Sequence, residues 1–234
     1  MNFGDSVNLR EAAADIRYLL DRGYPQKGAV VFVCAHYRLD TEAMYLLLRT
    51  VVARETAEKR KAKFLPCNRI EGNNIIIDGY NIIIGMESIL EKKAYLCDDE
   101  VTRDIKGISR NYKVSEITEK AIELILQFLK ENQPAYVCFL LDSQISKSGQ
   151  LASALRRKMQ EFGLKGDAKT SNHVDYDLKT SKYIVASSDG VIIDEAEKVV
   201  NFLSCIVSRF RYLEAGVERE LFYIKNPNLR DEIS

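Results

Sequence analysis

The chain has 234 residues, with 34 basic and 34 acidic side chains, so its formal net charge is zero. Hydrophobic residues make up 46% and charged residues 29%, which is typical of a globular protein. No apolar stretch is long enough for a transmembrane helix, and the first residues do not resemble a signal peptide. We therefore expect a cytoplasmic protein outside the membrane, which could bind nucleic acid only through a local basic surface.

Cysteine and histidine usage argues against a zinc site. The five cysteines are widely spaced and lie mostly in apolar runs, so we expect reduced thiols in the core. They are Cys34, Cys67, Cys97, Cys138 and Cys205. With only two histidines, a catalytic metal would have to be held by oxygen atoms.

The N-terminal part of the sequence predicts helices. Apolar residues recur at helical spacing over 9–21, with Asn8 as the expected N-cap. A second helix is expected from Asp40 or Thr41 to about residue 53, whereas the apolar run 29–35 fits a helix or a strand.

A charged stretch and a series of turn residues then mark a domain boundary. We place a small, mainly helical domain at 1–66 and an α/β domain at 67–234. Within the second domain, apolar strands alternate with amphipathic helices, which indicates a mostly parallel central sheet flanked by helices. The expected strands are 74–78, 135–141, 182–187 and an edge strand at 220–224; the expected helices are 115–131, 149–162 and about 195–212.

Three of these strands end on an aspartate followed by Gly or Ser: Asp78, Asp142 and Asp189. Ligands of open α/β sheets bind at the carboxyl ends of the strands. A cluster of carboxylates there is costly unless a cation neutralises it, and hard cations such as Mg²⁺ or Mn²⁺ prefer oxygen ligands. Each aspartate alone is also typical of a turn, but the combination favours a metal site.

The motifs around these aspartates resemble those of NYN and PIN-like nuclease domains. Asp78-Gly79-Tyr80-Asn81 is similar to the opening motif, and residues 187–189 resemble a late Thr/Ser-Ser-Asp signature. The resemblance covers about residues 72–200 and implies a metal-dependent nuclease in which Asn81 shapes the loop. The whole chain also resembles an uncharacterised, largely archaeal family that pairs a small helical domain with a PIN-like domain.

The resemblance also implies a fourth acidic position before the last of these strands. Asp175 is favoured and Asp177 stays open, while Ser188 is expected to support Asp189. A second acidic group contains Asp98, Asp99 and Asp104; Asp104 could support the site or form a local ion pair. No Glu stands clearly at the helical second position of the family pattern.

Two segments are candidates for contacts to substrate. Ser146, Lys147 and Ser148 precede a helix, where hydroxyl groups, a lysine and backbone amides suit a phosphate or a plain N-cap equally well. Arg156 and Arg157, like the basic stretch 54–63, are more typical of a solvated helix face, but they would supply phosphate contacts to a nucleic acid.

The sequence thus predicts a metal-dependent nuclease that hydrolyses phosphodiester bonds, with RNA favoured over DNA. Asp78, Asp142, Asp175 and Asp189 would hold Mg²⁺ or Mn²⁺. The alternative is a catalytically degenerate PIN-like module that binds nucleic acid or protein. A phosphatase-like enzyme ranks last, because Asp78 is followed by Gly-Tyr rather than by x-Asp. A homodimer is one assembly that the sequence permits.

Overall fold

The computed structural model describes residues 3–104, 112–213 and 224–225. Its described part forms two compact units. The helical unit comprises residues 3–62, 93–104 and 224–225, and the α/β unit comprises residues 63–92 and 112–213. The helical unit therefore includes a segment that lies far beyond residue 66 in the sequence.

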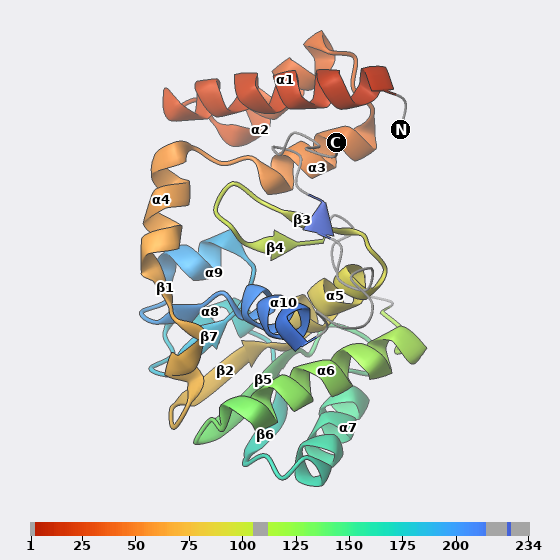
Figure 1. The fold of residues 1–234 in the computed structure, drawn as a ribbon, viewed down its shortest axis with the longest axis vertical. Coiled ribbons are helices and arrows are strands. Elements are labelled where there is room, and N and C mark those ends of the chain that lie inside the picture. Colours follow the sequence, from red (N-terminus) through yellow and green to blue (C-terminus); the bar gives the residue numbers. More distant parts are fainter. Residues whose placement is uncertain (1–2, 105–111, 214–223, 226–234) are drawn as a thin grey trace. The chain divides into compact units, whose positions relative to one another are not determined.

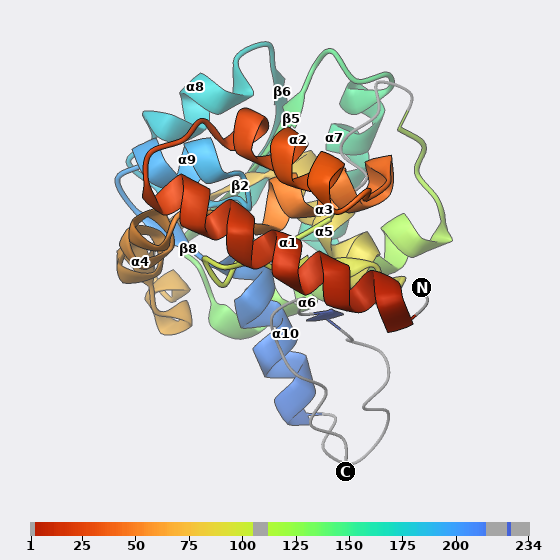
Figure 2. The ribbon, with the colours of Figure 1, turned by 90° about the horizontal axis from the view of Figure 1, so that it is seen from above.

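The helical unit is built on four helices, of which α1, α2 and α3 pack in succession (Figure 2). They are α1 (Phe3–Asp21), α2 (Gln26–His36), α3 (Thr41–Thr50) and α4 (Arg54–Lys63). The ambiguous apolar run 29–35 is helical, since it lies inside α2. Asn8 is not an N-cap, because α1 begins earlier. Asp40 does cap α3, and its carboxylate accepts a hydrogen bond from the backbone N–H of Ala43 at 2.8 Å.

A small sheet completes the helical unit. β3 (Ala94–Leu96) pairs antiparallel with β4 (Thr102–Arg103) and parallel with β9 (Ile224–Lys225). The periodicity of the sequence did not predict this hairpin. Most of the edge strand expected at 220–224 falls outside the described residues.

The α/β unit contains a six-stranded sheet in which every pair of neighbouring strands is parallel, as the sequence predicted. Its central strand, β2, buries four of its five residues. In spatial order the strands are β1 (Phe64–Leu65), β8 (Val199–Val200), β7 (Ile184–Ala186), β2 (Asn74–Asp78), β5 (Tyr136–Asp142) and β6 (Gly166–Ser171).

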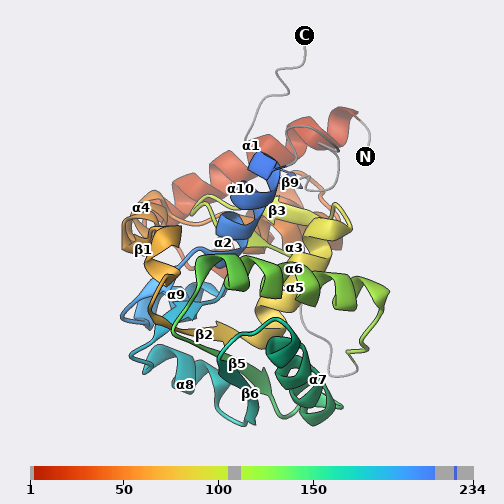
Figure 3. The ribbon, with the colours of Figure 1, turned by 60° about the horizontal axis from the view of Figure 1, so that its bottom comes forward.

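Helices flank this sheet (Figures 1 and 3). α5, α6 and α10 pack against one another, α7 packs on β5 and β6, and α8 packs beside α9. The helices are η1 (Cys67–Ile70), α5 (Gly79–Leu90), α6 (Glu116–Asn132), α7 (Ser148–Glu161), α8 (Val174–Lys179), α9 (Gly190–Glu195) and α10 (Phe202–Leu213). The expected helix from residue 195 was wrong in its first turns, because β8 precedes α10.

The order of the strands creates a switch point next to β2. After β2 the chain moves to β5 and then outward to β6, whereas after β7 it moves the opposite way to β8. Adjacent strands whose connections leave in opposite directions open a crevice at their carboxyl ends, and ligands of such sheets bind there. The fold therefore places the switch point between β2 and β7.

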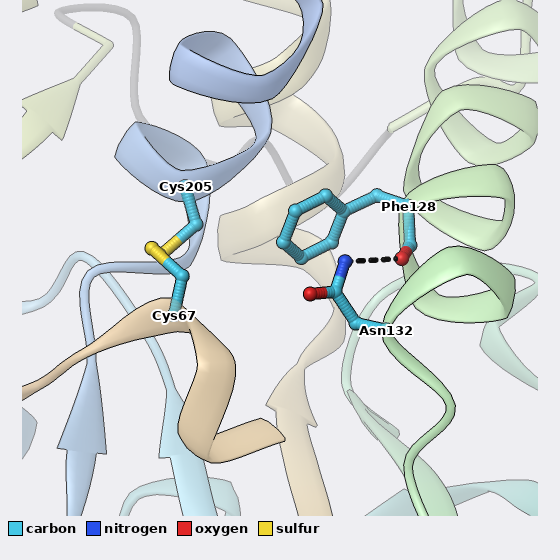
Figure 4. Close-up of a disulfide and its surroundings, with 4 residues drawn as sticks. All are labelled: Cys67, Phe128, Asn132 and Cys205. Atoms are coloured by element: carbon cyan, nitrogen blue, oxygen red, sulfur yellow. Dashed lines mark hydrogen bonds between the residues drawn. A yellow bond between two sulfur atoms is a disulfide. The ribbon is translucent and has the colours of Figure 1, made fainter. Parts of the chain in front are cut away.

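The expectation of five reduced cysteines was wrong. Cys67 in η1 and Cys205 in α10 form a disulfide (Figure 4). Cys34, Cys97 and Cys138 are free and buried. The two bonded cysteines are 138 positions apart, so no local pattern could have paired them. The bond joins the segment that precedes β2 to the last helix of the unit.

Candidate active site

The side chain of Asp78 lies at the carboxyl end of the central strand, where β2 passes directly into α5. Gly79 makes this tight transition possible. A Cβ atom on Gly79 would lie 2.5 Å from Leu141 Cδ2 and 2.9 Å from the carbonyl oxygen of Leu140. The glycine of the Asp-Gly-Tyr-Asn motif is thus required because α5 begins in contact with β5.

Asp78 is a buried carboxyl group, only 8% exposed. Its Oδ2 accepts a hydrogen bond from Ser187 Oγ at 2.8 Å, and Ser187 Oγ accepts one from the backbone N–H of Asp189 at 3.1 Å. Burial, together with the smaller effects of the charges of Asp189 and Asp175, raises the pKa of Asp78 to about 7, although the hydrogen bond from Ser187 opposes the rise. Three carboxyl groups from three segments therefore interact at the switch point.

Asn81 and Ser188 join the start of α5 to the end of β7. Asn81 Oδ1 accepts hydrogen bonds from both the backbone N–H and the Oγ of Ser188, each at 2.7 Å. The sequence expected Asn81 to shape the loop, and its position fits that role. This pair of bonds fixes the two strand ends that carry Asp78 and Asp189 relative to each other.

Asp189 and Asp142 also have local structural roles. Asp189 Oδ1 caps α9 by accepting hydrogen bonds from the backbone N–H groups of Val191 and Ile192 at 2.8 and 3.2 Å. Asp142 Oδ1 accepts one from the backbone N–H of Gln144 at 2.8 Å, which is the turn chemistry that the sequence analysis had set against a metal role. In both cases Oδ1 makes these bonds, and a second carboxylate oxygen is available.

The structure distinguishes the two acidic residues at the start of α8. Asp177 Oδ2 accepts a 2.5 Å hydrogen bond from Ser171 Oγ at the end of β6. Asp175 is the residue whose charge acts on Asp78. The arrangement thus favours Asp175 as the fourth acidic side chain of the site and gives Asp177 a positioning role.

The donor set at this edge consists of carboxylate, amide and hydroxyl oxygens, which suits a hard cation. Within residues 3–104, 112–213 and 224–225, however, no group of three or more His, Cys, Asp and Glu side chains is close enough to hold an ion by itself. Mg²⁺ commonly binds to one or two carboxylates and keeps its waters until substrate phosphates replace them. The residues fit this mode of binding rather than a closed protein cage.

A cavity of about 640 Å³ lies in the α/β unit beside the start of α5. Its lining includes Tyr80 and, from the expected phosphate segment, Ser146 and Lys147. Burial and, as the smaller cause, the charge of Asp142 raise the pKa of Tyr80 to about 12, so the cavity adjoins the carboxylate edge.

The other expected substrate contacts have different environments. Ser148 is buried in the first turn of α7. Arg156 is held by β6, where it donates a hydrogen bond to the carbonyl oxygen of Ala168 and lies 3.7 Å from Asp167 Oδ1. Arg157 is exposed on α7, which agrees with a solvated helix face.

The second acidic group of the sequence analysis belongs to the helical unit. Asp98 forms a bidentate pair with Arg17 at 2.8 and 2.9 Å. Arg49 Nη1 lies 3.4 Å from Asp104 Oδ2 and donates to the Asp104 carbonyl at 2.8 Å. Asp104 therefore has a structural partner and does not belong to the compact unit that carries Asp78.

Sequence reasoning missed several residues of the site. Ser187 belongs to the Ser-Ser-Asp motif at residues 187–189, but its hydrogen bond to Asp78 was not expected. Its position next to Ser188 was the only local signal. Tyr112 makes an edge-to-face contact with Tyr80, with ring centroids 5.3 Å apart. Glu87 in α5 accepts hydrogen bonds from Tyr112 Oη and Thr118 Oγ1, and no local pattern marked these three residues as neighbours.

The fold and the site define a doubly wound α/β protein in which acidic side chains gather where the direction of the connections reverses. The chain belongs to the family described as "Domain of unknown function (DUF5616)", whose match covers residues 67–205. Residues 8–63 match the family described as "Protein of unknown function (DUF434)". An uncharacterised protein of Methanocaldococcus jannaschii is 36% identical over 209 residues, which cover 89% of this chain and 99% of that protein. No solved structure matches the chain.

Proposed function

We propose that the carboxyl edge of the parallel sheet is the active site of a metal-dependent nuclease that hydrolyses phosphodiester bonds, with RNA as the expected substrate. The observation that supports this most is the position of Asp78. It is buried at the switch point, where the charges of Asp189 and Asp175 raise its pKa, and it has no ion-pair partner among the residues that the structure describes. Such a group of mutually repelling carboxyl groups is stabilised by a divalent cation and is typical of catalytic sites.

The residues of the site have two kinds of role in this proposal, metal binding and positioning. Asp78 and Asp189, with Asp175 next to them, supply the carboxylate oxygens that would hold Mg²⁺ or Mn²⁺. Bound there, the metal ion would lower the pKa of a water and neutralise charge on the phosphodiester. Ser187 orients Asp78, and the bonds between Asn81 and Ser188 keep the two strand ends at a fixed separation. The charge of Asp142 raises the pKa of Tyr80, which lines the cavity, so Asp142 lies on the side of the site that borders the cavity.

The decisive experiment compares the wild type with an Asp78→Asn/Asp189→Asn double variant. Asparagine retains N-capping, so α9 keeps its cap while the two charges are removed. We expect cleavage of single-stranded RNA oligonucleotides in Mn²⁺ to fall by about 100-fold or more. Calorimetry should show weaker Mn²⁺ binding as well.

Two controls accompany this comparison. Asp167→Asn removes an aspartate charge on β6, and matched DNA oligonucleotides test the expected preference for RNA. Unchanged cleavage by the folded double variant would contradict the proposal.

A binding module without hydrolytic activity is the second candidate. It is favoured by the bonds that Asp142 and Asp177 make to their own surroundings, since these roles need no metal. A folded wild type that binds RNA equally well in EDTA and in Mn²⁺, and cleaves it in neither, would support this alternative.

The location of the protein belongs to the same proposal. None of the helices over the described residues is long and apolar enough to cross a bilayer. We propose a cytoplasmic protein, with nucleic acid rather than a membrane as its partner. The disulfide removes one argument for this location, because the cysteines are not all reduced thiols.

A further inference from the structure

We propose that the cavity beside α5 binds a nucleotide, with its base among the tyrosines and aliphatic side chains and its phosphate near Lys147. This inference rests on the proposed function, because it assigns the cavity to the nucleotide next to the bond that is cut. A cavity of about 640 Å³ is within the usual size range of small-molecule sites.

Two tyrosine side chains line part of the cavity. Tyr80 and Tyr112 meet at an interplanar angle of 78°. Glu87 holds Tyr112 by accepting a hydrogen bond from its hydroxyl group, and Thr118 donates to the same carboxylate oxygen. The aromatic wall is therefore fixed before a ligand arrives. Tyr80 is buried and supports this wall, so the partly exposed ring of Tyr112 is the surface on which the flat π-face of a base can stack.

Part of the cavity lining is aliphatic. Ile122 from α6 and Leu151 and Ala154 from α7 form this part, and Ile122 and Leu151 are buried. Gln150 and Ser146 add hydrogen-bonding groups at the same cavity. An apolar wall with a few polar groups suits a nucleobase, whereas inorganic phosphate alone would leave this wall unused.

The lining of the cavity also carries positive charge that is not neutralised by ion pairs among the described residues. Lys158 is paired with Glu119 at 2.7 Å and with Glu123 at 3.1 Å. Lys113 and Lys147 also line the cavity, and neither has an ion-pair partner among the residues that the structure describes. The cavity thus combines aromatic and aliphatic side chains with free cationic groups, which is complementary to a nucleoside monophosphate.

Lys147 precedes α7 in a left-handed backbone conformation, which the structure also shows at four other non-glycine residues. Its φ is +65°, in the left-handed region where glycine or asparagine is ordinarily found. Strained non-glycine residues of this kind concentrate at ligand-binding sites. Lys147 lines the cavity and follows Asp142, at the end of β5, by five positions in the sequence.

The test uses the full chain in EDTA, so that metal-dependent cleavage does not contribute. AMP and UMP are titrated calorimetrically, with adenosine, ribose 5-phosphate and inorganic phosphate as partial ligands. We expect saturable binding of both nucleotides. Each partial ligand should bind at least about tenfold more weakly than the two nucleotides, because it lacks either the base or the phosphate.

Three variants locate the site. Lys147→Gly relieves the backbone and should leave the melting temperature equal or higher, yet weaken nucleotide binding about tenfold. Ala154→Phe fills the cavity and should abolish binding. Lys165→Ala removes an exposed lysine that does not line the cavity and should change nothing.

Equal binding of AMP and ribose 5-phosphate would overturn the proposal, as would nucleotide affinity that both Lys147→Gly and Ala154→Phe leave unchanged. Failure of the nuclease proposal is distinguishable from this result. Nucleotide binding in EDTA without RNA cleavage in Mn²⁺ would support the cavity and refute the nuclease. RNA cleavage in Mn²⁺ without nucleotide binding in EDTA would support the nuclease and refute the nucleotide site in the cavity.

Discussion

At the scale of single residues, Asp78 shows how burial and neighbouring charge act on one carboxyl group. Burial and the charges of Asp189 and Asp175 raise its pKa to about 7, whereas an aspartate in an unfolded chain titrates near 4. Between these values the folded state holds a proton that the unfolded state has released. This group therefore contributes stability below about pH 4, and the contribution is lost as the pH rises towards 7.

We predict that Asp78→Asn stabilises the protein at high pH and has little effect at low pH. A pKa difference of this size corresponds to on the order of 4 kcal/mol, part of which relaxation of the site will remove. The melting temperature of the variant should exceed that of the wild type by about 5 °C or more at pH 8, by an intermediate amount at about pH 5, and by little at about pH 3.5.

Thermal unfolding followed by circular dichroism, in EDTA, measures this difference. Glu161→Gln, on the exposed end of α7, is the matched control and should show no such pH dependence. An Asp78→Asn variant that is less stable than the wild type at pH 8 would show that the carboxylate has a compensating partner in the apo protein.

At the scale of secondary structure elements, the start of α5 depends on how closely it approaches β5. The sequence marked Gly79 as part of a motif, but the reason lies in another strand. A side chain at this position would contact Leu141 and the Leu140 carbonyl oxygen, and the backbone atom cannot move aside at low cost.

We predict that Gly79→Ala destabilises the protein by about 1–3 kcal/mol, because the added methyl group overpacks the junction. The melting temperature should fall by about 2–4 °C for each kcal/mol. Gly149→Ala in α7 is the control; a Cβ there meets nothing within 4 Å, so its effect should be neutral or slightly stabilising. Equal melting temperatures for the two variants would argue against the close approach.

At the scale of the whole molecule, the helical unit is not a simple N-terminal fragment. The hairpin formed by β3 and β4 supplies carboxylates to arginines of the first helices. Asp99 is fully buried between Arg60 and Arg103, at 2.8 and 2.7 Å. Burial alone would raise the pKa of Asp99, but the hydrogen bonds and charges of these arginines hold it below its usual range.

We predict that a fragment of residues 1–66 does not unfold cooperatively, because it lacks the hairpin. Removing one partner of a buried ion pair costs about 3–5 kcal/mol. The fragment loses Asp99, the buried partner of Arg60, and also the carboxylate partners of Arg17 and Arg49 in two less buried ion pairs. Thermal unfolding of the fragment should give a broad, non-cooperative transition. In the full chain, Asp99→Asn should lower the melting temperature. A sharp transition of the fragment would support the domain boundary expected at residue 66.

The sequence by itself determined the alternation of strands and helices, because hydrophobic periodicity and capping residues are local properties. It also placed Asp78, Asp142 and Asp189 at the ends of strands. Strands of two residues, such as β4 and β8, carry too little pattern to be recognised.

Only the tertiary structure decided which side chains meet. Three features depended on it: the bond of Ser187 to Asp78 across 109 positions, the pairing of Cys67 with Cys205, and the hairpin's place in the helical unit. These contacts result from strand order and packing between distant segments. A single sequence contains no local signal for them, because side chains that are far apart along the chain become neighbours only when the sheet and its helices assemble.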